Sequence, residues 1–313
     1  MKPYQIYSSL DFKNEIPNEL SHVSSYKGLL SLILDWLMIV ATLYVMCHYL
    51  NIVTFFVGMF FLGSRQHALA ILGHDAAHGL LLKNKKWNDL AADLLIGKPM
   101  FFDLHTYRKH HYSHHKFTNT DKDPDIVMLK SLGKFFKAKT AKDNFKEILK
   151  DFFWINTGYQ IRRVLTLSGK SKDSRIKDRN KFTSLTYLLL SQLLLIIVLI
   201  QIHYLAPVFW YLALLGPLSM FLRIRNLGEH WFLINNRTDL TISRNYCVNN
   251  RIEAFFFAPH NVNYHLVHHL FISVPFYNIP KLHKILMGDV TYANEHENKN
   301  SIFFGDSVFS SRK

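Results

Sequence analysis

Residues 28–64 read GLLSLILDWLMIVATLYVMCHYLNIVTFFVGMFFLGS, and this apolar run decides the fold class. Its only charged side chain is Asp35. One bilayer span needs about 20 consecutive apolar residues, so this run is long enough for two spans. Asn51, a polar residue beyond its middle, marks the expected turn between them. The run therefore predicts a transmembrane helical hairpin.

A second apolar run, residues 182–222, contains no Lys, Arg, Asp or Glu and has the same capacity for two spans. Its turn is expected near Ala206 and Pro207, where the apolar pattern is interrupted. We therefore expect an all-α integral membrane protein with four transmembrane helices in two hairpins. The predicted spans are about 29–50, 52–72, 183–205 and 208–226.

The formal net charge is +14, and the distribution of Lys and Arg along the chain is typical of membrane topology rather than of a nucleic-acid-binding surface. Neither predicted turn carries Lys or Arg, and the positive-inside rule then places the basic segments in the cytoplasm. The expected organisation is a cytoplasmic N-terminal arm (1–28), a membrane domain (29–285) and a C-terminal tail (286–313), with both termini and all histidine clusters cytoplasmic. Residues 90–102 are apolar but short, which favours an interfacial or re-entrant segment. We expect no nucleic-acid partner.

One charged pair is expected within the first hairpin. Asp35 and Arg65 lie at similar distances before and after the turn at Asn51, so an antiparallel hairpin brings them to similar depth. An unpaired charge at membrane depth is costly, which favours an ion pair. The alternative is that Arg65 only marks the cytoplasmic interface.

The histidines gather in clusters with helical spacing. Residues 107–125, YRKHHYSHHKFTNTDKDPD, place His111, His114 and His115 at i, i+3 and i+4, on one face of a helix. The same spacing returns in residues 260–271, HNVNYHLVHHLF. Two pairs at i and i+4 lie at expected helix ends. His74 and His78 form the pair in GHDAAHG, and Asn226 and His230 form the pair in RIRNLGEH. The nine candidate metal ligands are His74, His78, His111, His114, His115, His230, His265, His268 and His269.

Nine imidazoles exceed the four ligands of one tetrahedral zinc and suit two metals. Imidazole without thiolate allows iron, zinc, copper or nickel, so ligand type alone leaves the metal open. A site at the ends of apolar spans faces lipid-like substrates, and oxidation of their unactivated C–H bonds favours two redox-active irons with O2. The alternatives are a structural zinc site or polar helix ends. Four further histidines are interpreted as packing residues or alternates: His67, His105, His110 and His260.

The chain resembles the membrane fatty acid desaturase family, which is marked by three histidine boxes. HDAAH (74–78), HYSHH (111–115) and HLVHH (265–269) are similar to these boxes, and the similar region extends from about Arg65 to His283. The resemblance implies four transmembrane helices under a helical cytoplasmic cap, with nine histidines holding two iron ions. It also implies that Asn226, four residues before His230, holds an iron-bound water.

The implied reaction is O2-dependent insertion of a double bond into the acyl chain of a lipid or acyl thioester. Carboxylates often orient ligand imidazoles, and the candidates here are Asp75, Asp125 and Glu229; capping or salt bridging is the alternative for each. The sequence has no flavin, iron–sulfur or HPGG haem motif, so a separate donor, ferredoxin or cytochrome b5-like, is expected. The basic segment 130–181 is its candidate docking surface, or else a site for anionic lipid.

Two other functions remain open. One is hydroxylation or ketolation of a lipid, carotenoid or small amphiphile on the same scaffold, because such relatives share the histidine boxes. The other is metal binding without catalysis, which needs neither a ninth histidine nor a water-holding Asn. The sequence leaves the substrate carrier, the position of the double bond, the electron donor and the oligomeric state undetermined.

Overall fold

The computed structural model describes residues 17–131, 140–162, 181–230, 240–247 and 250–309. Within these ranges the chain is mainly helical, and its strands are the two-residue β1 (Asn245–Tyr246) and β2 (Asn298–Lys299), which pair in parallel. The α-helices are α1 (Ser25–His48), α2 (Ile52–Ala77), α3 (Lys85–Ala92), α4 (Leu104–Phe117), α5 (Pro124–Ser131), α6 (Ala141–Phe152), α8 (Lys181–Ile200), α9 (Ala206–Leu215), α10 (Pro217–His230), α11 (Arg251–Phe257), α12 (His265–Leu270), α13 (Ile279–Leu286) and α14 (Val290–Glu295). The predicted all-α class is confirmed.

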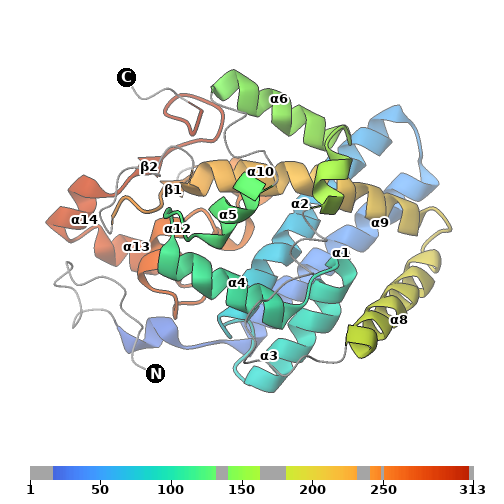
Figure 1. Ribbon diagram of the computed structural model, residues 1–313, viewed down its shortest axis with the longest axis horizontal. Helices are drawn as coiled ribbons and strands as arrows, with labels where there is room; N and C mark the ends of the chain where they lie inside the picture. The colour runs from blue at the N-terminus through green and yellow to red at the C-terminus, as the bar shows by residue number, and fades with distance from the viewer. Residues whose placement is uncertain (1–16, 132–139, 163–180, 231–239, 248–249, 310–313) are drawn as a thin grey trace.

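Within the described residues, three helical runs are long and apolar enough to cross a bilayer: α1, α2 and the run Ala206–His230 formed by α9 and α10. Helix α8 is also apolar, but its part with described side chains, Thr186–Ile200, is shorter than a span. Figure 1 shows α8 and α9 at one end of the molecule and the short helices α12, α13 and α14 at the other, with α10 running between them. The fourth span and the cytoplasmic cap therefore stay predictions.

Helices α1 and α2 form the first predicted hairpin, and they turn at Asn51. The Asn51 side chain accepts hydrogen bonds from the backbone N–H groups of Val53 (2.9 Å) and Thr54 (3.0 Å), and the Thr54 hydroxyl accepts from the N–H of Asn51 (2.9 Å). This capping box supplies partners for the free N–H groups that begin α2. With 26 residues, α2 is about 39 Å long and exceeds a hydrocarbon core of about 30 Å.

The pairing of Asp35 with Arg65 is confirmed. The Arg65 Nη1 atom lies 3.5 Å from the Asp35 Oδ1 atom, and the two side chains are 3% and 1% exposed. The charges therefore neutralise each other between α1 and α2, away from both water and lipid.

The last predicted span is interrupted. Helix α9 ends at Leu215 and α10 begins at Pro217, because proline has no N–H to continue the helical ladder. The indole Nε1 of Trp154 donates a 2.7 Å hydrogen bond to the carbonyl of Leu212, one of the last carbonyls of α9. The indole fits there because Gly216 has no side chain. The carbonyl of Leu212 also accepts the N–H of Gly216 (3.2 Å), so Trp154 packs the central segment against the break without replacing the hydrogen bond that Pro217 cannot make.

The central segment also reaches the far end of α2. The rings of Phe152 and Phe153 lie 6.4 and 5.9 Å from that of Phe56, and the ring of Trp154 lies 6.2 Å from that of Phe55. Phe55 and Phe56 follow the turn at Asn51 by only four and five residues. The described part of the segment between the histidine clusters, 140–162, therefore packs beside the long helices instead of only covering one end of them.

Residues 90–102 form an irregular helical segment; that it is interfacial or re-entrant stays a prediction. Helix α3 continues into a π-helix (Asp93–Gly97) and a 3-10 turn (Lys98–Met100). Two indoles bond to its carbonyls: Trp36 Nε1 donates to Leu95 (3.1 Å), and Trp210 Nε1 donates to Pro99 (3.4 Å). Irregular backbone beside transmembrane helices needs such partners, because lipid supplies none.

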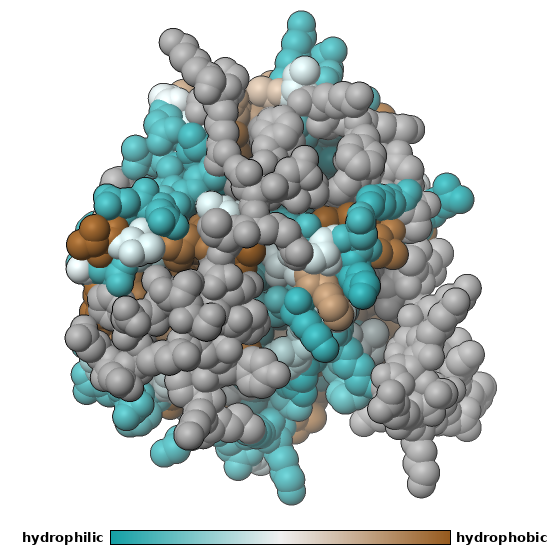
Figure 2. Space-filling view, turned by 60° about the vertical axis from the view of Figure 1, so that its left-hand side comes forward, coloured by the Kyte–Doolittle hydropathy of each residue, from teal (hydrophilic) through white to brown (hydrophobic). Residues whose placement is uncertain are grey.

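The end of the molecule that carries α12, α13 and α14 has its own apolar core. Leu266, Val267 and Leu270 of α12 pack against Leu282 and Leu286 of α13. Figure 2 views the molecule with this end brought forward, and hydrophilic residues cover much of its described surface. Most of the segment predicted as a C-terminal tail belongs to this region, through α14 and the β1–β2 pair. The proposed domain boundary at 285 stays a prediction.

Candidate metal centre

Five of the predicted ligands form one group, the first metal group. His74 and His78 come from the end of α2, His111 and His115 from α4, and His268 from α12. One potential ligand atom from each lies within 4.8 Å of all the others. The Nε2 atom of His111 is 3.0 Å from that of His78 and 2.9 Å from that of His115.

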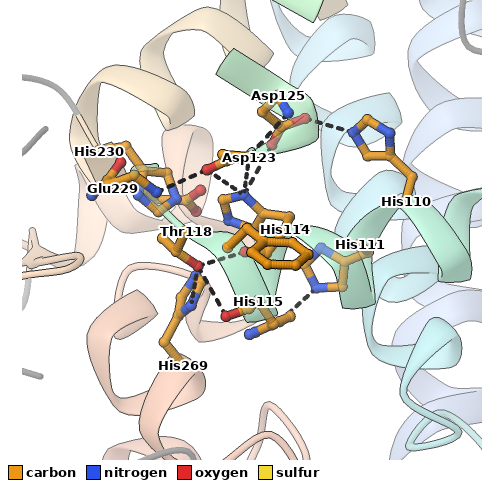
Figure 3. Close-up of polar contacts among 12 residues, drawn as sticks. His110, His111, His114, His115, Thr118, Asp123, Asp125, Glu229, His230 and His269 are labelled. Carbon is orange, nitrogen blue, oxygen red and sulfur yellow. Dashed lines mark hydrogen bonds and ion pairs between the residues drawn. The ribbon is translucent and has the colours of Figure 1, made fainter. Parts of the chain in front are cut away.

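The other four predicted ligands form the second metal group: His114, His230, His265 and His269, whose potential ligand atoms also lie within 4.8 Å of one another. The Nε2 atom of His265 lies 3.2 Å from that of His230 and 3.0 Å from that of His269. Figure 3 shows His114, His230 and His269 converging from three separate segments. All nine sequence-predicted histidines therefore lie in two adjacent groups; that they bind metal stays a prediction.

Each HxxHH motif divides its histidines between the two groups. On α4, the residues at i and i+4, His111 and His115, belong to the first group, and the residue at i+3, His114, belongs to the second. On α12 the division is reversed, because His265 and His269 belong to the second group and His268 to the first. Helices α4 and α12 thus each contribute histidines to both groups, which places the two groups side by side.

The chemistry of these atoms fits metal ions. A neutral imidazole has one N–H and one acceptor nitrogen, so Nε2 atoms that converge in sets of three or more cannot all be paired by N–H···N bonds. Among the described residues, both ring nitrogens of His74 are buried without a hydrogen-bond partner. A cation between the rings would use these lone pairs. The donor set is all imidazole, which suits iron, zinc, copper or nickel.

The electrostatics also favour the metal-binding form. Burial lowers the pKa of His78 to about 3. Burial likewise lowers the pKa of five ligand candidates on α4 and α12 well below the ordinary value, namely His111, His115, His265, His268 and His269. Ligand imidazoles must be deprotonated to bind metal, so the centre holds these rings ready for it.

His114 is the exception. Burial acts to lower its pKa, but Asp123, Asp125 and Glu229 outweigh burial and raise it above the ordinary value. The His114 Nδ1 atom lies 3.0 Å from Asp123 Oδ1 and 3.4 Å from Asp125 Oδ2 (Figure 3). A carboxylate on Nδ1 turns the other ring nitrogen, Nε2, toward the second metal group.

Sequence reasoning named Asp125 but missed Asp123. Asp123 is 1% exposed and accepts the backbone N–H groups of Asn119 (2.9 Å) and Asp125 (3.0 Å), so its carboxylate is fixed. Asp125 lies mainly against His110, with 2.7 Å between its Oδ1 atom and the Nε2 atom of His110. The acidic DKDPD turn contained the signal, but nothing in the sequence separates its three aspartates.

Thr118 was also missed. Its hydroxyl donates to the carbonyl of His114 (2.7 Å), and its Oγ1 atom lies 3.4 Å from the Nδ1 atom of His269. Figure 3 shows Thr118 between α4 and α12. It is the first residue after α4, in the HHKFTNT part of the motif, and its partner is 151 residues away.

Glu229 and Asp75, the other two carboxylates expected to orient ligand histidines, both lie beside the metal groups, but they contact different partners. Glu229 Oε2 lies 3.3 Å from His265 Nε2, while Glu229 Oε1 accepts from Arg225 Nε (2.6 Å). Asp75 Oδ2 accepts the backbone N–H of Phe276 (3.0 Å), and its Oδ1 atom is 3.7 Å from the Nδ1 atom of His74. Since 3.7 Å is beyond hydrogen-bond distance, Asp75 primarily anchors the chain after α12.

Asn226 lies one helical turn before His230 on α10, and its side chain is exposed. Its expected role of holding a water stays a prediction. The alternates lie outside both metal groups: His105 is exposed, His67 is fully buried against Phe221, and His260 contacts Asp35.

Arg108 joins α4 to the end of α2. Its Nε donates to the carbonyl of Ala77 (2.7 Å), and its Nη1 donates to Asp89 Oδ2 (2.9 Å). The last carbonyls of a helix lack partners within it and attract cations. Arg108 thus caps α2 directly before His78 and holds α4 where His111 meets it.

The chain was compared with known proteins. The model of the family described as fatty acid desaturase matches residues 48–299. A dihydrorhizobitoxine desaturase from Bradyrhizobium elkanii is 26% identical, over 92% of this chain and 83% of the relative. An sn-1 acyl-lipid omega-3 desaturase (ferredoxin) from Nostoc sp. (strain 36) is 25% identical, over 91% of this chain and 82% of the relative.

Proposed function

Because the chain belongs to the fatty acid desaturase family, we propose that it is a membrane-bound di-iron enzyme that uses O2 to introduce a double bond into the acyl chain of a lipid or acyl thioester. At family level the protein is an oxidoreductase with apolar helices typical of a membrane protein. The metal, the reaction and the substrate are the proposed part.

The observation that carries this proposal is the convergence of nine histidines in two groups at the ends of α2 and α10. Each group would hold one iron ion, with five imidazoles in the first and four in the second. Bound iron would supply the activation of O2. Asn226, one turn before His230, is proposed to complete the second group through a water, in keeping with that group having one imidazole fewer.

The chain's own part is to fix ligand geometry and keep the rings neutral. Most of the nine side chains are buried, which keeps water from the centre. Asp123 holds His114, and Arg108 holds α4 against α2. Such rigid placement limits the reaction to the substrate carbons that lie beside the centre.

The proposed reaction is balanced as follows. A CH2–CH2 unit loses two hydrogens and becomes CH=CH, while O2 takes up these two hydrogens, two external electrons and two protons to give two waters. The electrons require a separate donor, and we propose a ferredoxin or a cytochrome b5-like protein. The ferredoxin in the name of the Nostoc relative supports the first. Much of the basic segment proposed as the docking surface, 130–181, lies outside the described residues.

We further propose that the metal groups and both termini face the cytoplasm. The groups lie at the ends of α2 and α10 that are opposite the turn at Asn51. That turn carries no Lys or Arg, whereas Lys83, Lys85 and Lys86 follow α2 beyond its metal end.

A second candidate is oxidation of a small amphiphile on the same scaffold, by desaturation, hydroxylation or ketolation. It is favoured by one observation: the relative that matches 92% of this chain is named for dihydrorhizobitoxine, not for a fatty acid. A metal-binding protein without catalysis is the least supported reading.

The test compares total lipids and polar metabolites, by mass, from an iron-replete host expressing the wild type or His269→Ala. A product two hydrogens lighter that appears only with the wild type supports desaturation, and a product that gains oxygen supports hydroxylation or ketolation. His105→Ala is the matched control, because His105 is exposed on α4 and lies outside both metal groups. A wild type that contains iron in purified form but changes no metabolite would favour the binding protein.

A further inference from the structure

Three charged or polar side chains from distant parts of the chain meet in one buried cluster. Asp35 of α1 lies between Arg65 of α2 and His260, which precedes α12. The His260 Nε2 atom is 2.6 Å from Asp35 Oδ2, while Arg65 Nη1 is 3.5 Å from Asp35 Oδ1. Asp35 is 1% exposed and Arg65 is 2% exposed. We call these three residues the charged latch.

The latch joins α2 to α11 as well. The Arg65 Nη2 atom donates to the carbonyl of Phe255, and the guanidinium lies 4.2 Å from the centre of the Phe255 ring. The neighbouring Ser64 hydroxyl donates to the carbonyl of Phe256 (2.9 Å). Helix α11 is therefore fastened to the first hairpin through its last turn.

The backbone between α11 and α12 has a conformation that needs outside support. His260 and Asn261 both have left-handed φ angles, 53° and 57°. Such angles are unfavourable for residues with a side chain and persist where the surroundings hold them. Here the Asp35 carboxylate contacts the side chain of His260, and the side-chain Nδ2 of Asn261 donates to the backbone carbonyl of Phe276 (3.0 Å). This turn ends four residues before His265.

Helix α12, six residues long, follows this turn and contributes to both metal groups. His268 belongs to the first group, and His265 and His269 belong to the second. Because the helix is short and rigid, a shift or rotation of α12 moves ligands of both groups together. A fixed turn before it therefore fixes the ligands of both groups.

We propose that the charged latch is a positioning device through which the first hairpin sets the place of α12 and, with it, the geometry of both metal groups. The proposal rests on the function proposed above only in taking these groups as metal sites. The latch residues are positioning residues and touch neither group. Mutual neutralisation of two buried charges would account for the Asp35–Arg65 pair. It would not account for the contact of Asp35 with His260, whose backbone has a left-handed φ.

The experiment uses the full-length protein in detergent, prepared without metal and titrated with Co2+ as the spectroscopic probe. His78→Ala isolates the second group and His269→Ala isolates the first. Adding His260→Leu to either variant is expected to weaken the remaining Co2+ site about tenfold or more, in line with other groups that hold metal ligands in place. His260→Gln keeps an N–H donor for Asp35, so it should restore most of the affinity.

Hydrogen exchange of residues 258–271 in the metal-free protein gives a second readout. His260→Leu and Asp35→Asn should each accelerate exchange there. In the His260→Leu background, Asp35→Asn should add only the effect of losing the Arg65 ion pair, because the Asp35–His260 contact is already absent. His48→Leu, an exposed histidine on α1, is the control and should change neither readout.

Weakening of only one group, or unchanged exchange in residues 258–271, would overturn the latch. A wild type that binds no Co2+ and no iron would instead remove the proposed function, and hydrogen exchange alone would then decide whether the latch fixes α12. The two failures are therefore distinguishable.

Discussion

The Nε2 atoms of His115 and His268 lie 3.1 Å apart, although 153 positions separate the two residues in the sequence. This contact closes the first metal group between α4 and α12. It also brings the second group together, because His114 is adjacent to His115 and His269 is adjacent to His268. Neighbouring residues thus belong to different groups.

His115→Ala and His114→Ala are expected to remove different metals, although the residues are adjacent. Each variant should lose about half of the bound iron, and each should lose activity about 100-fold or more, since both metals are needed in the proposed reaction. The double variant should contain almost no iron. Iron per purified chain measures this, with His105→Ala as control. Equal and complete loss in both single variants would contradict two separable groups.

Asp123→Asn should weaken metal binding at the second group by about 10- to 100-fold, the usual effect of removing a carboxylate from a ligand histidine. Asp125→Asn is the matched comparison and should have a smaller effect, because Asp125 is more exposed and farther from His114. Competitive titration with a chelator gives both affinities. A larger effect at Asp125 would reverse this assignment.

Arg108→Gln removes the guanidinium that caps α2, and it should destabilise the metal-free protein by roughly 1–3 kcal/mol through lost hydrogen bonds to a charged group. Arg108→Lys keeps the charge but cannot reach both Ala77 and Asp89 as a fork, so its effect should be intermediate. The thermal midpoint Tm in detergent measures both variants. Identical Tm values for all three proteins would show that the cap contributes nothing.

The metal-free protein should lose stability as the pH falls below about 6.5. An unfolded histidine has a pKa near 6.5, whereas burial lowers the pKa of folded His78 to about 3. Between these values the unfolded chain binds more protons, so the free energy of unfolding falls by about 1.4 kcal/mol per pH unit for each such imidazole. Above pH 6.5 these groups add no pH dependence.

The check is Tm of the metal-free protein between about pH 5 and 8, the range around the unfolded pKa. His78→Phe should flatten the profile by about one imidazole. Stability that rises toward acid would have the wrong sign for buried neutral histidines.

Gly216→Ala should destabilise the protein by about 1–3 kcal/mol through overpacking. A β-carbon at this position would lie 2.6 Å from the Nε1 atom of Trp154 and 3.0 Å from the carbonyl oxygen of Asp151. Gly158→Ala is the matched control, because a β-carbon there meets no atom within 4 Å. Comparable Tm losses in both variants would mean that the indole moves aside without cost.

The sequence predicts best what depends on local spacing. The nearly uncharged run 28–64 locates the first hairpin, because hydrocarbon excludes charge. Asn51 locates its turn, because the start of a helix needs a capping group. The i, i+3, i+4 spacing identifies six of the nine histidines, and i, i+4 pairs at helix ends identify His74, His78 and His230, because both spacings place side chains on one helix face.

Non-local contacts are what sequence reasoning could not supply. The division of HxxHH between two groups depends on how α4 and α12 lie across each other, which no local spacing encodes. The indole of Trp154 at Gly216 and the carboxylate of Asp123 at His114 likewise depend on tertiary packing. The DKDPD turn has three aspartates, and the sequence interpretation chose Asp125, whereas the carboxylate that the N–H of Asn119 holds beside His114 belongs to Asp123.

The late position of α12 in the chain has a consequence for biosynthesis. A ribosome makes α1, α2 and α4 long before His265, His268 and His269 leave the exit tunnel. Until then the first metal group lacks one ligand and the second lacks two. In the proposed enzyme the complete ligand set would exist only after α12 is made, so metal loading would follow synthesis. A chain that stops before residue 265 would lack a complete set of histidines in either group.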